Sequence, residues 1–371
     1  MSVVAYVSGH GFGHSAREVD ILRRLPDDIP LVVKTSAPEW FWRAEVSRPF
    51  TFVADAFDVG CLQSNSLDVD APATLAAYKE IAAQNAARAD EELEDLRRRG
   101  ARVVLTDVPA FPLTLAARLG IPGLCVANFT WADIYAHLAE EEPGFGPLAA
   151  RLESEYAQAA LLLDADLSLP MTYFPRRTEV GIVARPWRAR RDELLRLLPP
   201  EVARAGKRVA LLYVGNWGLP LPWPRLETFG DGWHFVSLAA PPVPVANFSV
   251  LPQTAMPHPD LVASLDLVIS KPGYGLVGEC LAAGTPLLYC PREAFVEYQA
   301  LDAVLSGWPG GLRIPTEAFL DADWRPYLDR VPPRGSIESR PAGGGRRAAD
   351  IITRACQDPP DQIFTGLPAS S

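Results

Sequence analysis

A segment rich in glycine and histidine directly follows the first apolar run of the sequence. Residues 8–17 read SGHGFGHSAR after the predicted strand 3–7. Glycines at a strand-to-helix turn let a ligand approach the backbone, and the N-terminus of the next helix favours anions or oxyanions. An imidazole there can act as a general base, because its unperturbed pKa lies near neutrality. We therefore predict that His14 is a catalytic base and that Gly13 belongs to a ligand-binding turn; a tight turn with backbone-bonded histidines is the alternative.

Asp107 stands where another predicted strand, 101–106, ends. Because the carboxyl ends of parallel strands meet at one edge of a sheet, we expect Asp107 on the same edge as His14. A carboxylate there can orient an imidazole and stabilise its cation, as in hydrolase triads. We predict this catalytic partnership, with a helix N-cap as the alternative role. After the next strand, Trp131 and Tyr135 form either an apolar wall for a sugar ring or part of the core.

A second strand–turn–helix unit spans residues 269–291, ISKPGYGLVGECLAAGTPLLYCP. Its loop carries Lys271 and Gly273 ahead of a helix expected over 275–283, whose first N–H groups can hold a diphosphate. Glu279 follows about one turn later, where it can accept hydrogen bonds from ribose hydroxyls. An ordinary βαβ turn with a surface glutamate is the alternative. The loop is not a P-loop, because no G-K-S/T closes it.

Two weaker segments follow strand ends in the second half of the sequence. Gly215, in YVGNWG, closes the first strand of that half, so it is the counterpart of the first glycine turn. Glu297, in CPREAFVEYQALDA, could hydrogen-bond sugar hydroxyls, although a solvated helix start explains it equally well. His234 and His258 are isolated in the sequence, and we assign them no role in a site.

Short strand-like runs alternate with helical stretches along most of the chain. This alternation predicts βα units and mostly parallel sheets. It occurs twice, so the expected fold class is α/β, with two Rossmann-like domains facing a cleft. The expected strands are 3–7, 31–34, 50–54, 101–106, 121–128 and 165–170, then 208–216, 233–239, 247–252, 265–271 and 286–291. The expected helices include 73–98, 112–120, 147–163 and 275–283.

A change of composition near residues 184–208 separates the two sets. The stretch is basic and then broken by prolines, which suits a hinge between domains. We therefore expect an N-terminal Rossmann-like domain at 1–184 and a C-terminal Rossmann-like domain at 185–345. A C-terminal helix and tail occupy 346–371.

The overall composition is that of an ordinary globular protein, with 48% hydrophobic and 22% charged residues in a chain of 371. The net charge of −10 argues against general nucleic-acid binding, because phosphates would be repelled. Five scattered cysteines without a CxxC pair fit neither a zinc ribbon nor a disulfide scaffold. The apolar runs are too short to span a bilayer and the N-terminus does not resemble a signal peptide. We expect a cytoplasmic protein without a transmembrane segment.

Taken together, these motifs resemble the metal-independent GT-B glycosyltransferases, which include the peptidoglycan N-acetylglucosaminyltransferase. KPGYGLVGECLAAGTPLLYCP looks like their donor-diphosphate element. A nearer likeness is to the N-terminal glycosyltransferase-like region of plant L-arabinokinases, at SGHGFGHSAR, ANFTWADIYA, PREAFVEYQAL and DWRPYLDR. This resemblance extends over most of residues 3–345. The sugar-kinase half of those proteins has no counterpart here, so we expect no kinase activity.

The resemblance implies a nucleotide-sugar donor, usually UDP-linked, and no other cofactor. It also implies that the domain at 1–184 binds the acceptor and the domain at 185–345 the donor. It implies that Glu279 binds the ribose and Glu297 the donor sugar. It also implies that His14 is the base or an acceptor contact, with Asp107 as its partner. One departure concerns the sugar, because the peptidoglycan enzyme has paired glutamines where this chain reads EYQ (297–299). The residues that the likeness assigns to the diphosphate are Gly273, Tyr274 and Gly275.

These inferences predict an inverting glycosyltransferase in which His14 deprotonates an acceptor hydroxyl. No DxD stands out as a metal site, so we expect no metal ion; Lys271 and a helix dipole would neutralise the leaving diphosphate. Two alternatives remain open. A nucleotide-sugar 2-epimerase would need no acceptor, and a non-catalytic nucleotide-sugar sensor would bind the donor without turnover. The sequence does not indicate the acceptor.

Overall fold

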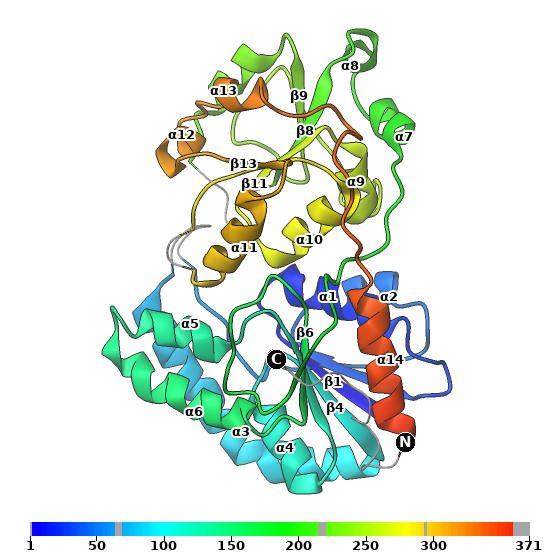
Figure 1. Cartoon of the computed structure of the whole chain (residues 1–371), viewed down its shortest axis with the longest axis vertical. Coiled ribbons are helices and arrows are strands. Elements are labelled where there is room, and N and C mark those ends of the chain that lie inside the picture. Colours follow the sequence, from blue (N-terminus) through cyan, green and yellow to red (C-terminus); the bar gives the residue numbers. More distant parts are fainter. Residues whose placement is uncertain (1, 64–68, 214–219, 293–294, 359–371) are drawn as a thin grey trace. The chain divides into compact units, whose positions relative to one another are not determined.

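The chain divides into two compact α/β units, each built on its own parallel sheet (Figure 1). The computed structural model describes residues 2–63, 69–213, 220–292 and 295–358. The first unit contains the described residues up to Arg185 except Gln63, together with those from Ala342 onward. The second unit runs from Pro186 to Pro341. This confirms the predicted fold class, two successive Rossmann-like sets of strands and helices.

The sheet of the first unit has the strand order β3-β2-β1-β4-β5-β6-β7, and all its neighbours are parallel. Its central strands are runs of buried Val, Leu and Ala, as expected for a sheet covered on both faces. The strands are β1 (Ser2–Val7), β2 (Leu31–Thr35), β3 (Thr51–Ala54), β4 (Ala101–Asp107), β5 (Gly123–Ala127), β6 (Leu161–Asp164) and β7 (Arg177–Glu179).

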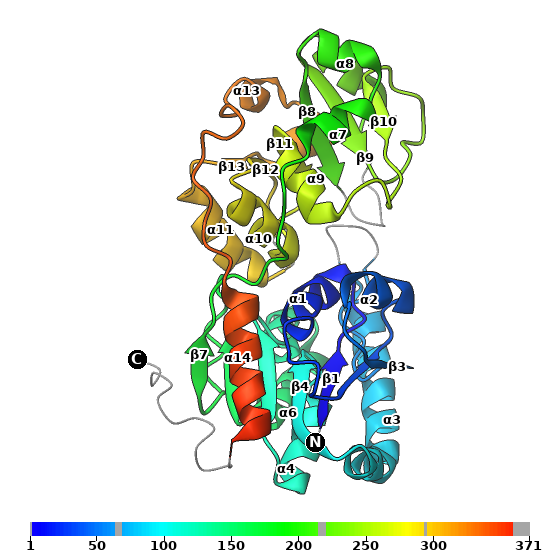
Figure 2. The same ribbon diagram turned by 90° about the vertical axis from the view of Figure 1, so that its right-hand side faces the viewer.

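Helices cover both faces of this sheet. Side chains from α3 and α4 pack with Val4, Tyr6 and Val104 on one face, and the C-terminal helix α14 lies beside α1 and β4 (Figure 2). The helices are α1 (Phe12–Leu22), α2 (Glu39–Glu45), α3 (Ala71–Arg98), α4 (Phe111–Leu119), α5 (Trp131–Leu138), α6 (Gly146–Tyr156) and α14 (Gly344–Gln357), with a 3-10 turn at Pro143–Phe145.

The second sheet has the order β10-β9-β8-β11-β12-β13, again entirely parallel. Its strands are β8 (Arg208–Tyr213), β9 (Trp233–Ser237), β10 (Phe248–Val250), β11 (Leu267–Ser270), β12 (Leu287–Tyr289) and β13 (Gly311–Arg313). Its helices are α7 (Arg191–Arg196), α8 (Pro200–Arg204), α9 (His258–Ser264), α10 (Tyr274–Ala283), α11 (Glu297–Ser306), α12 (Thr316–Leu320) and α13 (Arg325–Leu328), with a 3-10 segment at Trp223–Phe229.

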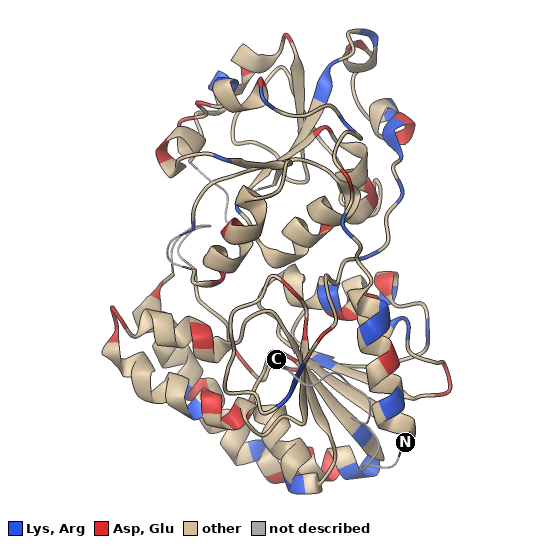
Figure 3. Ribbon diagram, viewed as in Figure 1, with Lys and Arg blue, Asp and Glu red and all other residues tan. Residues whose placement is uncertain are grey.

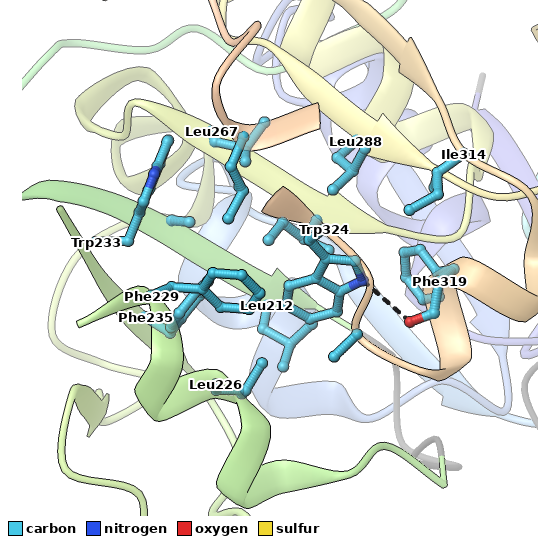
Figure 4. Close-up of a cluster of buried hydrophobic side chains, with 14 of the residues drawn as sticks. Leu212, Leu226, Phe229, Trp233, Phe235, Leu267, Leu288, Ile314, Phe319 and Trp324 are labelled. Carbon is cyan, nitrogen blue, oxygen red and sulfur yellow. Dashed lines mark hydrogen bonds between the residues drawn. The ribbon is translucent and has the colours of Figure 1, made fainter. Parts of the chain in front are cut away.

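An aromatic cluster holds the last helices of the second unit on its sheet (Figure 4). Trp324 is fully buried, and its ring stacks on Phe229 at 6.1 Å between centroids. Its indole Nε1 donates a hydrogen bond of 3.0 Å to the carbonyl oxygen of Phe319. Because the one polar atom of the indole is satisfied, Trp324 can be buried without a desolvation penalty.

One pair of predicted elements in the first unit was wrong. The helix expected over 147–163 ends at Tyr156, and the strand expected over 165–170 lies earlier, at β6. The four residues of β6 are buried and pair with β5, so they complete the sheet rather than a helix. Asp166 and Leu167 have φ of 65° and 51°, and such left-handed residues end a strand.

Positively and negatively charged residues are interspersed along the helices of the first unit (Figure 3). At the end of α3, for example, Arg98 and Arg99 both pair with Asp95. Within the described residues, no helix combines the length and apolar character needed to cross a membrane.

Candidate functional site

Each sheet reverses its strand order beside its first strand. In the first unit β1 lies between β2 and β4, and in the second β8 lies between β9 and β11. Open parallel sheets bind ligands outside the carboxyl ends of strands at such a reversal. The strand ends there are Val7 beside Asp107, and Tyr213 beside Ser270. These two edges are therefore the expected ligand-binding positions of the two sheets.

The first edge carries the predicted histidine and its carboxylate in direct contact. Gly11 caps α1 with φ of 72°, which favours glycine, and His14 follows in the first turn of the helix. His14 Nδ1 lies 2.7 Å from Asp107 Oδ1, and the two residues are 6% and 0% exposed. An ionised carboxylate can only accept, so Nδ1 donates and the lone pair is on Nε2. No described residue hydrogen-bonds Nε2, so this atom is available to take a proton.

Arg17 keeps the Asp107 carboxylate ionised. Its Nε donates to Asp107 Oδ2 at 2.7 Å and its Nη2 to Oδ1 at 2.5 Å, while Nη1 donates to Asn128 Oδ1 at 2.6 Å. Burial by itself would raise the pKa of Asp107, but the charges of Arg17 and His14 hold it below its usual value. Sequence reasoning missed Arg17, although it closes the SGHGFGHSAR segment one helical turn after His14.

Glu18 is a second buried acid in the same cluster. It lies four residues after His14 on α1 and is fully buried. Burial and the negative charge of Asp107 raise the pKa of Glu18 well above its usual value. Neither carboxyl oxygen of Glu18 has a hydrogen-bond partner among the described residues, and an ionised Glu18 would repel Asp107. Burial and the charge of Asp107 therefore favour the neutral form of Glu18, whereas Arg17 and His14 favour the ionised form of Asp107.

A buried carboxylate fixes the aromatic residues next to this cluster. Trp131 Nε1 donates to Asp58 Oδ2 at 2.6 Å, and Ser8 Oγ donates to Asp58 Oδ1 at 3.0 Å. The Trp131 ring lies 5.9 Å from the His14 ring. Trp131 and Tyr135 are only 2% and 0% exposed, so they form part of the core, the alternative role given above, and not a ligand wall.

The second edge has an open helix N-terminus. Gly273 caps α10 without any side-chain hydrogen bond, and the first turn of α10 contains no acidic residue. A Cβ built on Gly273 would meet nothing within 4 Å, and the same is true of Gly13 on α1. Neither glycine has a positive φ, so neither the backbone nor a neighbour requires glycine there. Both positions leave space for a group that comes close to the backbone.

Two cations lie near that N-terminus. Burial, and secondly the charge of Arg292, lower the pKa of Lys271 to about 8. Arg292 Nη1 lies 3.8 Å from Glu297 Oε1, and its guanidinium covers the Phe295 ring at 3.4 Å. Glu297, the first residue of α11, also acts on Lys271 through its charge. The arrangement suits the binding of an anion beside α10.

Glu279 is paired with a histidine to which we had assigned no role in a site. It is 6% exposed on α10, and its Oε2 lies 2.7 Å from Nδ1 of His258. The His258 ring also lies edge-on to Tyr213, with centroids 5.3 Å apart. His258 begins α9, 21 residues before Glu279, and no sequence spacing indicates the contact because it depends on how α9 packs on α10.

The predicted site residues thus fall on two edges. His14, Asp107 and Gly13 belong to the first unit. Gly215 lies outside the described residues. No group of three or more His, Cys, Asp and Glu side chains arranged for a metal ion occurs in the described part of the chain. The residues on the edge of the second unit are Lys271, Gly273, Tyr274, Gly275, Glu279 and Glu297.

Comparison with known proteins begins with sequence. No family model matches the chain. The chain is 29% identical over 360 residues to an L-arabinokinase of Arabidopsis thaliana, and the match covers 94% of this chain. It covers 34% of the arabinokinase, so the chain spans about a third of the length of that relative.

Solved structures resemble the chain over nearly its whole length. The glycotransferase of kitacinnamycin superposes with a TM-score of 0.63 at 16% identity, covering 95% of this chain and 98% of that one. A UGT of Arabidopsis thaliana in complex with UDP-L-rhamnose gives 0.63 at 13% identity, covering 96% and 99%. Phytolacca americana UGT2 with UDP-2-fluoro-glucose and pterostilbene gives 0.61 at 14%, covering 96% of each chain. The chain therefore has the two-unit Rossmann-like fold of the GT-B glycosyltransferases.

Proposed function

We propose that the chain is an inverting glycosyltransferase, which moves a sugar from a nucleotide-diphosphate donor to an acceptor hydroxyl without a metal ion. The observation that carries the proposal is the hydrogen bond between His14 and Asp107 at the strand reversal of the first sheet. This hydrogen bond orients His14 as a base and leaves its Nε2 available. The fold on which it lies is shared by glycosyltransferases.

The proposed reaction is a single displacement. His14 Nε2 takes the proton of the acceptor hydroxyl, and the ionised Asp107 stabilises the imidazolium that forms. The acceptor oxygen bonds to the anomeric carbon as the bond from that carbon to the diphosphate oxygen breaks. The electron pair leaves with the nucleoside diphosphate. Because the proposed reaction is a single displacement, it inverts the configuration at the anomeric carbon.

The second unit is the proposed donor site. Lys271 and the N-terminus of α10 would neutralise the diphosphate, with Gly273, Tyr274 and Gly275 around it. Lys271, Arg292 and the N-terminus of α10 would supply the positive charge that a metal ion supplies in metal-dependent enzymes. We assign the ribose to Glu279 and the donor sugar to Glu297.

A UDP-linked sugar is the donor that we propose. Two of the structural relatives are complexes with UDP-L-rhamnose and with UDP-2-fluoro-glucose. A carboxylate such as Glu279, placed inside the diphosphate-binding helix, is a suitable acceptor for ribose hydroxyls.

Calorimetric titration with UDP, GDP, dTDP and ADP tests this proposal, on the wild type, on Glu279→Ala and on the control Glu91→Ala, which changes an exposed residue of α3. We expect one nucleotide, UDP, to bind the wild type and the control tightly. Loss of a charged hydrogen bond of about 1.5–3 kcal/mol predicts at least tenfold weaker binding to Glu279→Ala. Binding of none of the four would contradict the proposal.

Product analysis then separates transfer from the two alternatives. With a UDP-sugar and a set of acceptors, a transferase releases UDP and forms a glycoside. A change of the sugar without any acceptor would indicate an epimerase. Donor binding without either product across the acceptor set would indicate a sensor.

A further inference from the structure

We propose that His258 is a positioning residue, which holds the Glu279 carboxylate for ribose recognition and so makes the site prefer ribonucleotides over 2′-deoxyribonucleotides. The inference rests on the donor site proposed above. It adds a residue from a different helix and a specificity that the donor site alone does not imply.

The contact between the two residues is short, and its Glu279 side is buried. His258 Nδ1 lies 2.7 Å from Glu279 Oε2, and the Glu279 side chain is 7% exposed. Since a carboxylate accepts only, Nδ1 donates. A hydrogen bond to an ionised acceptor is about twice as strong as one between neutral groups, and low exposure protects it from competing water. The bond therefore fixes the plane of the Glu279 carboxylate.

Helix α9 gives His258 a firm support. Thr285 Oγ1 donates to the carbonyl oxygen of Val262 at 2.9 Å, which ties α9 to the segment after α10. Asp260, two residues after His258, accepts from the backbone N–H of Arg188 at 2.7 Å. On the sheet side, the His258 ring lies edge-on to Tyr213, the last residue of β8. The imidazole cannot turn away from Glu279 without disturbing this packing.

The second ring nitrogen of His258, Nε2, indicates that packing alone does not explain a histidine at this position. Nε2 of His258 is buried and has no hydrogen-bond partner among the described residues. Leaving a buried polar atom unsatisfied costs about 1–3 kcal/mol, which a phenylalanine of similar shape would avoid. Packing against Tyr213 alone thus does not account for an imidazole. The donor at Nδ1 does account for it.

A fixed carboxylate discriminates between sugars by the number of hydroxyls that it can accept from. A ribose offers neighbouring 2′ and 3′ hydroxyls, and a 2′-deoxyribose lacks one of them. A hydrogen bond to a charged group is worth about 1.5–3 kcal/mol, so we expect UDP to bind at least tenfold more tightly than 2′-deoxy-UDP. If His258 holds Glu279 in place, loss of its Nδ1 donor reduces that ratio.

Two substitutions separate positioning from packing. His258→Phe keeps a ring against Tyr213 and removes the donor, while His258→Asn keeps an N–H donor and removes the ring. Calorimetry with UDP and 2′-deoxy-UDP compares them with the wild type and with His137→Phe, a control on α5 of the first unit. We expect His258→Phe to bind UDP about tenfold more weakly and 2′-deoxy-UDP nearly normally. We expect His258→Asn to stay within about threefold of the wild type for both.

The opposite pattern overturns the inference: His258→Phe binding like the wild type, or both variants losing UDP and 2′-deoxy-UDP equally. A double variant, His258→Phe with Glu279→Gln, gives a second measure, because a residue that acts through Glu279 adds nothing once Glu279 is changed. If the two losses simply add, the inference is wrong. When the wild type binds UDP and Glu279→Ala does not, these results bear on His258 alone; if the wild type does not bind UDP, the proposed function itself fails.

Discussion

The strand next to the first strand of each sheet leads to charged residues of opposite sign in the two units. In the first unit β4 ends at Asp107, beside Val7 of β1. In the second, β11 ends at Ser270, beside Tyr213 of β8, and Lys271 follows at once. The two positions are equivalent in topology, since both lie next to the first strand of their sheet. The carboxyl end of this strand therefore carries a carboxylate in the first unit and leads directly to an ammonium group in the second.

The charges around Asp107 and around Lys271 also differ. Asp107 is fully buried and its charge is balanced by Arg17 and by its bond to His14. Lys271 lies near Arg292, a second cation, and the pKa of Lys271 falls to about 8 as a result of burial and of that charge. A balanced carboxylate next to an imidazole suits proton transfer. Cations that share one edge suit the binding of an anion.

The helices that start at the two edges, α1 and α10, differ in the charged residues of their first turns. Helix α1 carries His14, Arg17 and Glu18 within its first two turns. Helix α10 carries no charged residue before Glu279. The first N–H groups of α10 are therefore suited to binding a diphosphate. The first turns of α1, in contrast, already contain charged and titratable side chains of the protein. The comparison predicts that changes at the first edge affect rate and changes at the second affect donor affinity.

The largest expected effect is on the rate. Replacing His14 with alanine removes the proposed base, and general base catalysis contributes about 10²- to 10⁴-fold. We expect kcat for transfer to fall by that factor, while the Kd for UDP, set by Lys271 and Glu279, stays within about threefold. Initial rates and calorimetry on the same preparation measure both. His137→Ala, on α5, is the control; full activity in His14→Ala would break the comparison.

A smaller effect, on affinity, is expected at Lys271. The pKa of about 8 means that its ammonium group is present below pH 8 and is lost as the pH rises through that value. Wild-type affinity for UDP should therefore decline between pH 7.5 and 9. Lys271→Met should bind roughly tenfold more weakly at pH 7 and show no such decline. Calorimetry across this range measures it, with Lys79→Met, an exposed position on α3, as the control. A decline that persists in Lys271→Met would assign the titration to another group.

The pairing of His14 with Asp107 was predictable, although 93 residues separate them, because strand ends in a parallel sheet meet at one edge. The same rule placed Lys271 and Gly273 after a strand of the second sheet. These predictions needed only the order of strands and the glycines of the turns. They did not depend on how any helix is rotated about its axis.

What could not be predicted depends on how helices pack. The contact between His258 and Glu279 needs the orientation of α9 against α10, which hydrophobic periodicity does not give. Glu18 lies on the buried face of α1, where a pattern of apolar residues would not place an acid. The run at Leu161–Asp164 is three leucines and an aspartate, too short to show a period, so a strand and the end of a helix look alike in the sequence.

The smallest expected effect concerns stability and comes from Glu18. Its pKa in the folded protein is raised well above the usual value of about 4.5. As the pH rises above about 4.5, an unfolded chain releases this proton and the folded protein keeps it, so folding stability falls with pH through this window. Glu18→Gln removes this dependence and should be more stable than the wild type at pH 8.

Urea unfolding at pH 5 and pH 8, on the wild type, Glu18→Gln and the exposed control Glu91→Gln, measures the effect. The difference between wild type and Glu18→Gln should be larger at pH 8, because near pH 5 the unfolded glutamate is still partly protonated. The pKa of Asp107 is lowered, so we expect this residue to keep its charge at both pH values. Parallel behaviour of wild type and Glu18→Gln would mean that Glu18 is ionised in the folded protein. The first edge would then hold two carboxylate charges against Arg17 and His14, and its distinction from the cationic second edge would be sharper still.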